Sequence, residues 1–190
     1  MFKEAFGKEW PIPSLQGENL LLRPCCISDF DAIKAYRQDE ASCQYIRPPE
    51  SDEQIRTLVE QHCSPWELSE GRWNGLVVTE VENDKALGEI VFRIEDEVNL
   101  RAEIGYRIAP QAGGKGLATK GCRLLIDYLF AELGLFKVVA KCDPRNTASY
   151  RVMEKLGMVR EAHFKKHFKI GERWTDQYDY GLLKEDWKSR

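Results

Sequence analysis

The sequence predicts an α+β fold in which helices cover a central, twisted and mixed sheet. Two helical patterns come early, three strand-like runs follow, and strand then alternates with helix before two final strands. This mixture favours one α+β domain over an all-helical or all-β architecture. A chain of 190 residues can bury such a core without disulfides or a structural metal. We therefore expect a single domain over residues 1–190.

The N-terminal half predicts one strand, two helices and an antiparallel meander. After an N-terminal extension over residues 1–14, the apolar run Leu20–Arg23 forms the first strand. Ser28 is suited to N-cap a helix that ends near Gln38. The elements that follow are a helix over 52–63, a loop over 65–71, and strands over 73–81, 86–94 and 101–108, with turns at Asn83-Asp84 and at 96–99.

The C-terminal half predicts two helices placed between strands. An apolar periodicity over 118–133 predicts a long helix, and the β-branched run over 137–142 predicts a buried strand. Asn146 and Gly157 bound a second helix over 147–156, as its N-cap and its C-terminal stop. The last two strands, over 158–170 and 173–183, turn at Gly171.

Composition and charge exclude several classes of function. A net charge of −3 and a pI near 5.8 argue against non-specific nucleic-acid binding, which favours a basic surface. No apolar run approaches the roughly 20 residues that span a membrane, and the N-terminus lacks the apolar core of a secretory signal. The six cysteines form no Cys-x-x-Cys pair, and His163 and His167 have no third ligand in view. We expect a cytoplasmic protein without a nucleic-acid, membrane or metal partner.

The residues from Gln111 to Ala118 indicate a phosphate-binding loop. They lie between a strand closed by Ala109-Pro110 and the long predicted helix. Glycines at 113, 114 and 116 allow a tight turn and a close approach of the backbone to a ligand. The helix that follows offers unpaired N–H groups and the positive end of its dipole, which together favour phosphate.

Two common phosphate loops do not fit these residues. The nucleoside-triphosphate loop requires Gly-Lys-Ser or Gly-Lys-Thr, but Gly114-Lys115 is followed by Gly116. The dinucleotide fingerprint requires a third glycine where this chain has Thr119. The spacing that fits is Gln-x-x-Gly-x-Gly, formed by Gln111, Gly114 and Gly116. It resembles the acyl-coenzyme A pyrophosphate loop of the GNAT superfamily of N-acetyltransferases.

Three further segments resemble the same superfamily. The residues from Asp143 to Met158 are similar to its Asn-x-x-Ser segment followed by Glu-Lys-Leu-Gly. Leu20–Pro24, with Asp29 after it, is similar to the first strand of the Rim-type branch, which modifies the N-termini of proteins such as ribosomal proteins. The residues from Trp174 to Trp187 are similar to the last strand of that branch. The resemblance covers roughly residues 15–187.

The resemblance implies a GNAT-type three-layer α/β/α fold around a mostly antiparallel sheet. Two central parallel strands, over 101–108 and 137–142, would splay apart and hold the pantetheine arm of acetyl-CoA. It also implies direct transfer of an acetyl group to a primary amine, a protein N-terminal amine, in a ternary complex. Relatives often dimerise, so a homodimer is an open expectation. The residues expected to bind the cosubstrate are Tyr106, Arg107, Ile108, Gln111, Gly113, Gly114, Lys115, Gly116, Leu117, Ala118, Thr119, Asn146 and Ser149.

Transfer to an amine requires a base for the amine proton, a donor to the developing oxyanion and a proton for the leaving thiolate. Ser149 is the first candidate for the thiolate acid, and its alternative role is to cap the helix. The tyrosine that serves much of the superfamily is Met153 here. Glu103 is the leading candidate base and Glu89 the second, although either can be an ion-pair partner instead. Backbone N–H groups near Tyr106 to Ile108 would bind the oxyanion.

Two alternative functions stay open at this point. One keeps the fold and changes the acceptor to a polyamine, an amino sugar or an antibiotic amine. A strongly acidic cleft would favour that cationic acceptor, whereas a wide open groove would favour a peptide. The other alternative is a non-catalytic acyl-CoA-binding module, to which Met153 gives some weight.

Overall fold

The computed structural model describes residues 7–187 and contains one large mixed sheet. Its eight strands lie in the order β2-β3-β5-β6-β7-β8-β10-β9, and a separate two-stranded sheet pairs β1 with β4. In the described part of the chain, only β7 and β8 pair in parallel, so the sheet is mostly antiparallel as predicted. The strands are β1 (Glu9–Trp10), β2 (Leu15–Gln16), β3 (Leu20–Arg23), β4 (Trp66–Glu67), β5 (Trp73–Glu80), β6 (Asn83–Asp96), β7 (Arg101–Ile108), β8 (Lys137–Cys142), β9 (Val159–Ile170) and β10 (Arg173–Leu183).

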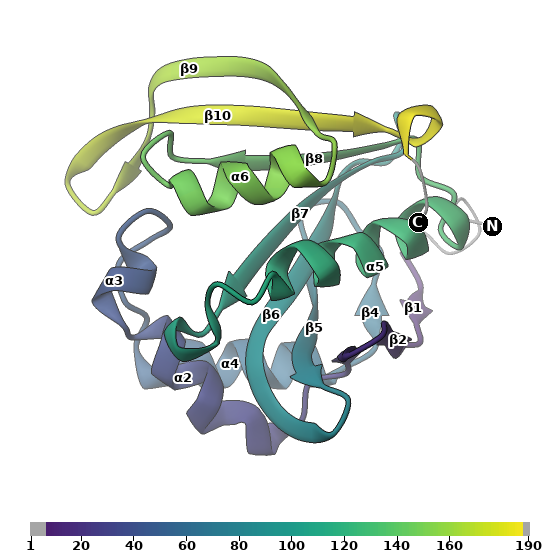
Figure 1. The fold of residues 1–190 in the computed structure, drawn as a ribbon, viewed down its shortest axis with the longest axis vertical. Helices are drawn as coiled ribbons and strands as arrows, with labels where there is room; N and C mark the ends of the chain where they lie inside the picture. Colours follow the sequence, from purple (N-terminus) through teal and green to yellow (C-terminus); the bar gives the residue numbers. More distant parts are fainter. Residues whose placement is uncertain (1–6, 188–190) are drawn as a thin grey trace.

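Helices cover both faces of the large sheet and give the predicted three-layer arrangement (Figure 1). We call the face under α5 (Leu117–Ala131) and α6 (Thr147–Lys155) the α5 face, and the opposite one, under α2 (Phe30–Arg37) and α4 (Asp52–Cys63), the α2 face. Apolar residues three and four apart on each helix form its buried stripe. The main core lies on the α5 face, and a smaller core lies beneath α2 and α4. The buried stripe of α5 consists of Cys122, Leu125, Ile126 and Leu129.

The two parallel strands separate part of the way along their length, as the resemblance implied. Their register pairs Arg101, Ala102 and Glu103 of β7 with Lys137, Val138 and Val139 of β8, and no later pair forms within the described residues. Beyond Glu103, β7 pairs with β6 at one edge only. The other edge of β7 therefore presents backbone groups to a gap, which we call the slot.

The predicted helix start at Ser28 is wrong. Ile27–Asp29 form a 3₁₀ turn, and α2 begins at Phe30. Asp29 is the N-cap residue of α2 but makes no side-chain bond to the helix. Its carboxylate instead accepts the Cys26 backbone N–H at 2.8 Å, which stabilises the 3₁₀ turn, and is held by both terminal nitrogens of Arg23, each at 2.8 Å.

Short elements and one turn also differ from the sequence-based expectation. The first hairpin turns at Val81-Glu82 rather than at Asn83-Asp84, because Asn83 already pairs with Glu80. The predicted loop over 65–71 contains β4, which pairs with β1, and a short helix α3 (Glu40–Cys43) was not predicted. Trp10 of β1 packs against the main core and donates its Nε1–H to the Tyr128 hydroxyl at 2.7 Å. These elements are too short to carry a readable periodicity.

The hairpin formed by β9 and β10 reaches across to α3 (Figure 1). Arg173, next to the turn at Gly171, donates from Nη2 to the Gln44 carbonyl at 2.9 Å. The two strands at the C-terminal edge of the sheet are thereby joined to the helical segment that follows α2. Residues of both α3 and the hairpin line the cavity described next.

Candidate active site

The glycine-rich loop leads directly into the N-terminus of α5. Gly114 and Gly116 have φ angles of 78° and 75°, which an L side chain rarely adopts, and a Cβ at either position would meet no atom within 4 Å. Gly116 is the N-cap residue of α5, with no side-chain cap and no acidic residue in the first turn. The first N–H groups of α5 are therefore available to an anion, in open space and at the positive end of the helix dipole.

The predicted cosubstrate residues divide between two places. Gly113, Gly114, Gly116, Leu117, Ala118 and Thr119 of the loop line a cavity of about 1240 Å³, as do Tyr106, Arg107, Ile108, Asn146 and Ser149. Gln111 and Lys115 are exposed and do not line it. The Lys115 ammonium instead lies 3.3 Å from the Glu80 carboxylate. Their part in binding the cosubstrate stays a prediction.

Asn146 begins α6 at the far side of the slot. Its Oδ1 accepts the Ser149 backbone N–H at 3.2 Å, which confirms it as the predicted N-cap. The loop before it is held by Asp143, which is 1% exposed and accepts from Arg145 and from the Thr175 hydroxyl at 2.5 Å. This buried carboxylate ties the start of α6 to β10 and so fixes the position of Asn146.

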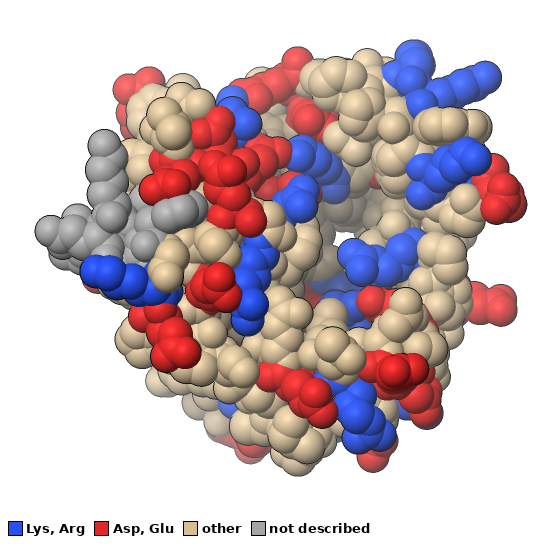
Figure 2. Space-filling model, turned by 180° about the vertical axis from the view of Figure 1, so that it is seen from behind, with Lys and Arg blue, Asp and Glu red and all other residues tan. Residues whose placement is uncertain are grey.

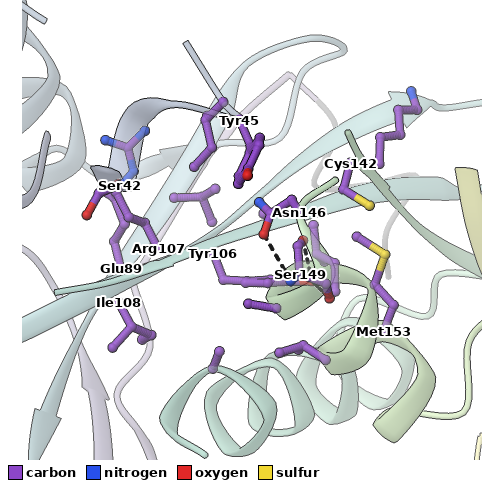
Figure 3. A pocket seen from close by; sticks show the side chains of 18 of the residues that line it. Ser42, Tyr45, Glu89, Tyr106, Arg107, Ile108, Cys142, Asn146, Ser149 and Met153 are labelled. Atoms are coloured by element: carbon purple, nitrogen blue, oxygen red, sulfur yellow. Dashed lines mark hydrogen bonds between the residues drawn. The ribbon is translucent and has the colours of Figure 1, made fainter. Parts of the chain in front are cut away.

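Ser149 contacts Tyr106 across the slot (Figure 3). The Tyr106 hydroxyl donates to the Ser149 carbonyl at 2.8 Å and lies 3.1 Å from Ser149 Oγ. Burial raises the pKa of Tyr106 well above its usual range, so the phenol stays protonated. Sequence reasoning had placed Tyr106 in the site through its backbone and had missed its side chain.

Two neighbours of Ser149 bear on the reaction chemistry. Burial raises the pKa of Cys142 to about 12, which leaves the thiol protonated and unsuited to act as a nucleophile. Met153, at the position where a tyrosine is common in the superfamily, is 1% exposed and packs in the main core. Ser149 and Tyr106 are thus the hydroxyl groups that α6 and β7 bring to this part of the cavity (Figure 3).

Both predicted carboxylates lie on the α2 face of the sheet, and each is paired with a cation. Glu103 Oε2 accepts from Arg93 at 2.6 Å and from Lys141 at 3.2 Å. Glu89 Oε1 accepts from Arg37 at 2.5 Å. The hydrogen bonds from Arg93 and Lys141 all end on Oε2 of Glu103, and Glu89 Oε2 is buried without a partner among residues 7–187. The ion-pair role left open for both residues is therefore present in the structure.

Sequence reasoning missed the residues that α2 and α4 bring to the same face. Arg37 and His62 are 6% and 5% exposed and line the cavity. Burial lowers the pKa of His62, which favours the neutral imidazole. Arg37 follows Ile33 and Tyr36 at the spacing of a buried helical stripe. An arginine within a buried helical stripe is unusual, and this feature of the sequence could have identified Arg37 as a site residue.

The cavity is lined by more cations than anions. Eight of the lining residues are Lys or Arg, and three are Asp or Glu, namely Glu89, Glu103 and Asp143. Each of these three carboxylates accepts a hydrogen bond from an Arg or Lys side chain. Figure 2 shows Lys and Arg side chains gathered around a hollow on this side of the molecule. The cavity is therefore wide and basic rather than acidic.

Neither a metal site nor a membrane helix is found in residues 7–187. No group of three or more His, Cys, Asp or Glu side chains there is arranged to hold a metal ion, and no helix there could cross a membrane. His163 instead contacts Asp176 at 2.8 Å, and the His167 ring lies 4.8 Å from the Phe164 ring.

Replacing Asn146 by alanine tests whether this residue does more than cap α6. We expect the free energy of unfolding to fall by about 1 kcal/mol, the usual value of an N-cap. We also expect the dissociation constant of acetyl-CoA to rise roughly threefold to tenfold, since one hydrogen bond between Asn146 and the cosubstrate would be lost. Denaturant titration and calorimetry measure the two effects.

Ser51→Ala is the matched control for this variant. Ser51 caps α4 by accepting the Gln54 backbone N–H at 3.3 Å, and it does not line the cavity. The control should lose similar stability and keep its affinity for acetyl-CoA. If both variants bind acetyl-CoA equally well, Asn146 is a helix cap alone.

Comparison with known proteins gives a consistent assignment. Residues 19–159 match the model of an acetyltransferase (GNAT) domain. The chain is 31% identical over 141 residues to the "Putative ribosomal N-acetyltransferase YdaF" of Bacillus subtilis, covering 74% of this chain and 75% of that protein. It is 31% identical over 157 residues to the spermidine N(1)-acetyltransferase of Escherichia coli K12, covering 82% of this chain and 81% of that protein. The crystal structure of a GNAT-family acetyltransferase from Bacillus anthracis superposes with a TM-score of 0.82 at 32% identity. The superposition covers 91% of this chain and 99% of that chain.

Proposed function

We propose a protein N-terminal amine as the acceptor of this chain, which belongs to the GNAT family of acetyltransferases and is an acetyl-CoA-dependent N-acetyltransferase. The observation that carries the proposal is the wide, basic cavity beside the slot. A polyamine brings several positive charges, and eight Lys and Arg side chains in the lining would repel it. A peptide brings one amine, and its remaining residues can lie along an open groove.

The residues at the slot fit acetyl-CoA. The open backbone at Gly114 and Gly116 and the free N-terminus of α5 suit a pyrophosphate, and the unpaired edge of β7 suits an extended amide-bearing arm. When bound there, the cosubstrate supplies an activated acetyl group as a thioester. In the overall reaction an N–C bond forms, the C–S bond breaks, and the proton lost by the amine balances the one gained by the thiolate.

The basic lining also helps to prepare the acceptor amine. Nearby positive charges lower the pKa of a bound ammonium, since they disfavour its charged form. The amine then loses a proton more readily, and we propose Glu103, through a water and its Oε1, as the group that receives it. Backbone N–H groups on the free edge of β7 would donate to the thioester oxygen as its charge grows.

Ser149 is the proposed source of the proton for the thiolate. Its hydroxyl lines the cavity, and Tyr106 lies within hydrogen-bond distance of it. Since the Tyr106 proton is directed to the Ser149 carbonyl, the serine hydroxyl can turn toward the leaving sulfur. The predicted cytoplasmic location and homodimer stay predictions.

Glu103→Gln is expected to lower kcat/KM about tenfold, which is modest for removal of a general base. The loss should be greatest at low pH, where less of the acceptor amine is already neutral. The measurement is a pH profile of thiol release. Glu95→Gln is the control, because Glu95 also pairs with Lys141 but does not line the cavity. An unchanged pH profile for Glu103→Gln would remove Glu103 as the base.

The acceptor class is tested by release of coenzyme A thiol with three kinds of amine. Short peptides with free N-termini, the same peptides with blocked N-termini, and spermidine are compared at equal concentration with acetyl-CoA. We expect turnover with the free peptides only. Turnover with spermidine and none with the peptides would overturn the proposal in favour of a small cationic acceptor.

A further inference from the structure

Arg107 is a buried guanidinium whose position the reaction described above does not explain. It lies on β7 next to Tyr106, with its side chain on the α2 face, and is 7% exposed. Its Nη1 donates to the Cys43 sulfur at 3.9 Å, a long contact with a weak acceptor. In the described part of the chain, no carboxylate lies within 4.0 Å of it.

The carboxylate of Glu89, which neighbours Arg107, binds another guanidinium instead. Glu89 lies opposite Arg107 in the β6–β7 ladder, yet its Oε1 accepts from Arg37 at 2.5 Å. Arg37 also binds Glu50 at 2.6 Å, so one guanidinium holds the carboxylates of both Glu89 and Glu50. Burial lowers the pKa of Arg107, and Glu89 opposes this shift while Arg37 adds to it, although a guanidinium stays charged in proteins.

A buried guanidinium with no carboxylate bonded to it is costly, and an anion that reaches its donors relieves that cost. Arg107 lines the same cavity as Ser149, Asn146 and the glycine-rich loop. In Figure 3 Arg107 and Glu89 lie on one side of Tyr106, and Asn146 and Ser149 lie on the other. An anion bound by Arg107 would thus be on the side of β7 opposite Ser149, where an acceptor meets the slot.

We infer that Arg107 binds a carboxylate of the acceptor, which makes the preferred acceptor a peptide with Asp or Glu in its first residues. This inference rests on the proposed function, because it concerns the acceptor of the same site. The guanidinium offers a forked pair of donors that matches the two oxygens of a carboxylate, whereas a neutral amide has a single acceptor oxygen and no charge. Arg107 lies next to Tyr106 on β7, and the Tyr106 hydroxyl contacts Ser149, so the carboxylate belongs near the amine.

The first test uses the unaltered protein and two matched peptides. Both have a free N-terminus and an amidated C-terminus, and they differ only in carrying Asp or Asn at the second position. Thiol release gives kcat/KM for each peptide. We expect a preference for the Asp peptide of about tenfold to a hundredfold, the range of a hydrogen bond between two charged groups. Equal values would overturn the inference and leave the proposed function standing.

Arg107→Gln identifies the group responsible for the preference. In this variant the kcat/KM values of the two peptides should agree within about twofold. The control Arg72→Gln removes another cation of the lining and should keep the preference for the Asp peptide. Thermal stabilisation by coenzyme A shows that each variant is folded. If Arg107→Gln keeps the full ratio, Arg107 is not the anchor. If it does not fold, the comparison on the unaltered protein decides.

Two small amines separate failure of this inference from failure of the proposed function. β-Alanine carries a carboxylate, and β-alaninamide carries a neutral amide in its place. Turnover with β-alanine alone, and with no peptide, would retain the carboxylate anchor but overturn the peptide acceptor. Turnover with neither peptides nor β-alanine, but with spermidine, would overturn both.

Discussion

Replacing Gly114 by valine is expected to weaken binding of coenzyme A about tenfold or more. Gly114 has a φ angle of 78°, in the left-handed region where an L residue costs roughly 1–2 kcal/mol and a β-branched residue is a rare outlier. The loop can relieve that strain only by turning its peptide groups, which moves the N–H groups away from the phosphate. Calorimetric titration with coenzyme A measures the loss.

Gly134→Val provides the matched control. Gly134 has a φ angle of 68° and open space around its Cβ, but it follows the C-terminal end of α5. Both variants should lose similar stability, because both force valine into the same backbone region. The control should still bind coenzyme A as the unaltered protein does. If Gly114→Val also keeps full affinity, the phosphate is not held by this loop.

Replacing Ser149 by alanine is expected to lower kcat about a hundredfold, at the lower end of the range for general acid catalysis. The affinity for acetyl-CoA should change little, because the backbone of residue 149 and its bond to Asn146 are retained. The two effects are separated by measuring kcat at saturating acceptor and the dissociation constant of coenzyme A by calorimetry. A large loss of affinity with unchanged kcat would assign Ser149 to binding instead.

Tyr106→Phe distinguishes Ser149 from its neighbour as the proton donor. The phenylalanine keeps the ring and removes the hydroxyl that donates to the Ser149 carbonyl. We expect only a severalfold loss of kcat, because Tyr106 has a raised pKa and positions Ser149 rather than supplying the proton. A loss of about a hundredfold for Tyr106→Phe, combined with a fully active Ser149→Ala variant, would transfer the role to Tyr106.

The local structure of the glycine-rich loop and of the start of α6 could be predicted because its signals are local. The loop over 111–118 carries its glycines in sequence, and Asn146 caps the helix that it begins. Such features depend on the conformation of a few consecutive residues. The family resemblance supplied the splay between β7 and β8, which no periodicity could reveal, and the register confirms it.

The acceptor side could not be predicted, because it depends on distant segments. Glu89 meets Arg107 only through the β6–β7 register, and Arg37 reaches Glu89 only after α2 docks on the sheet. Glu103 was found as a candidate base from its place on the strand, but its partners Arg93 and Lys141 come from two different strands. A pattern within one segment does not contain these contacts.

The alternation of side chains along β7 has a consequence for how such an enzyme can change during evolution. Tyr106 lies on the α5 face with Ser149, whereas Arg107 lies on the α2 face with Glu89, and the edge of the same strand borders the slot. If Arg107 anchors the acceptor as proposed, mutations at Arg107 and its neighbours would select a new acceptor without changing the side chains on the Ser149 side of the strand. The two faces of one strand could then diverge independently.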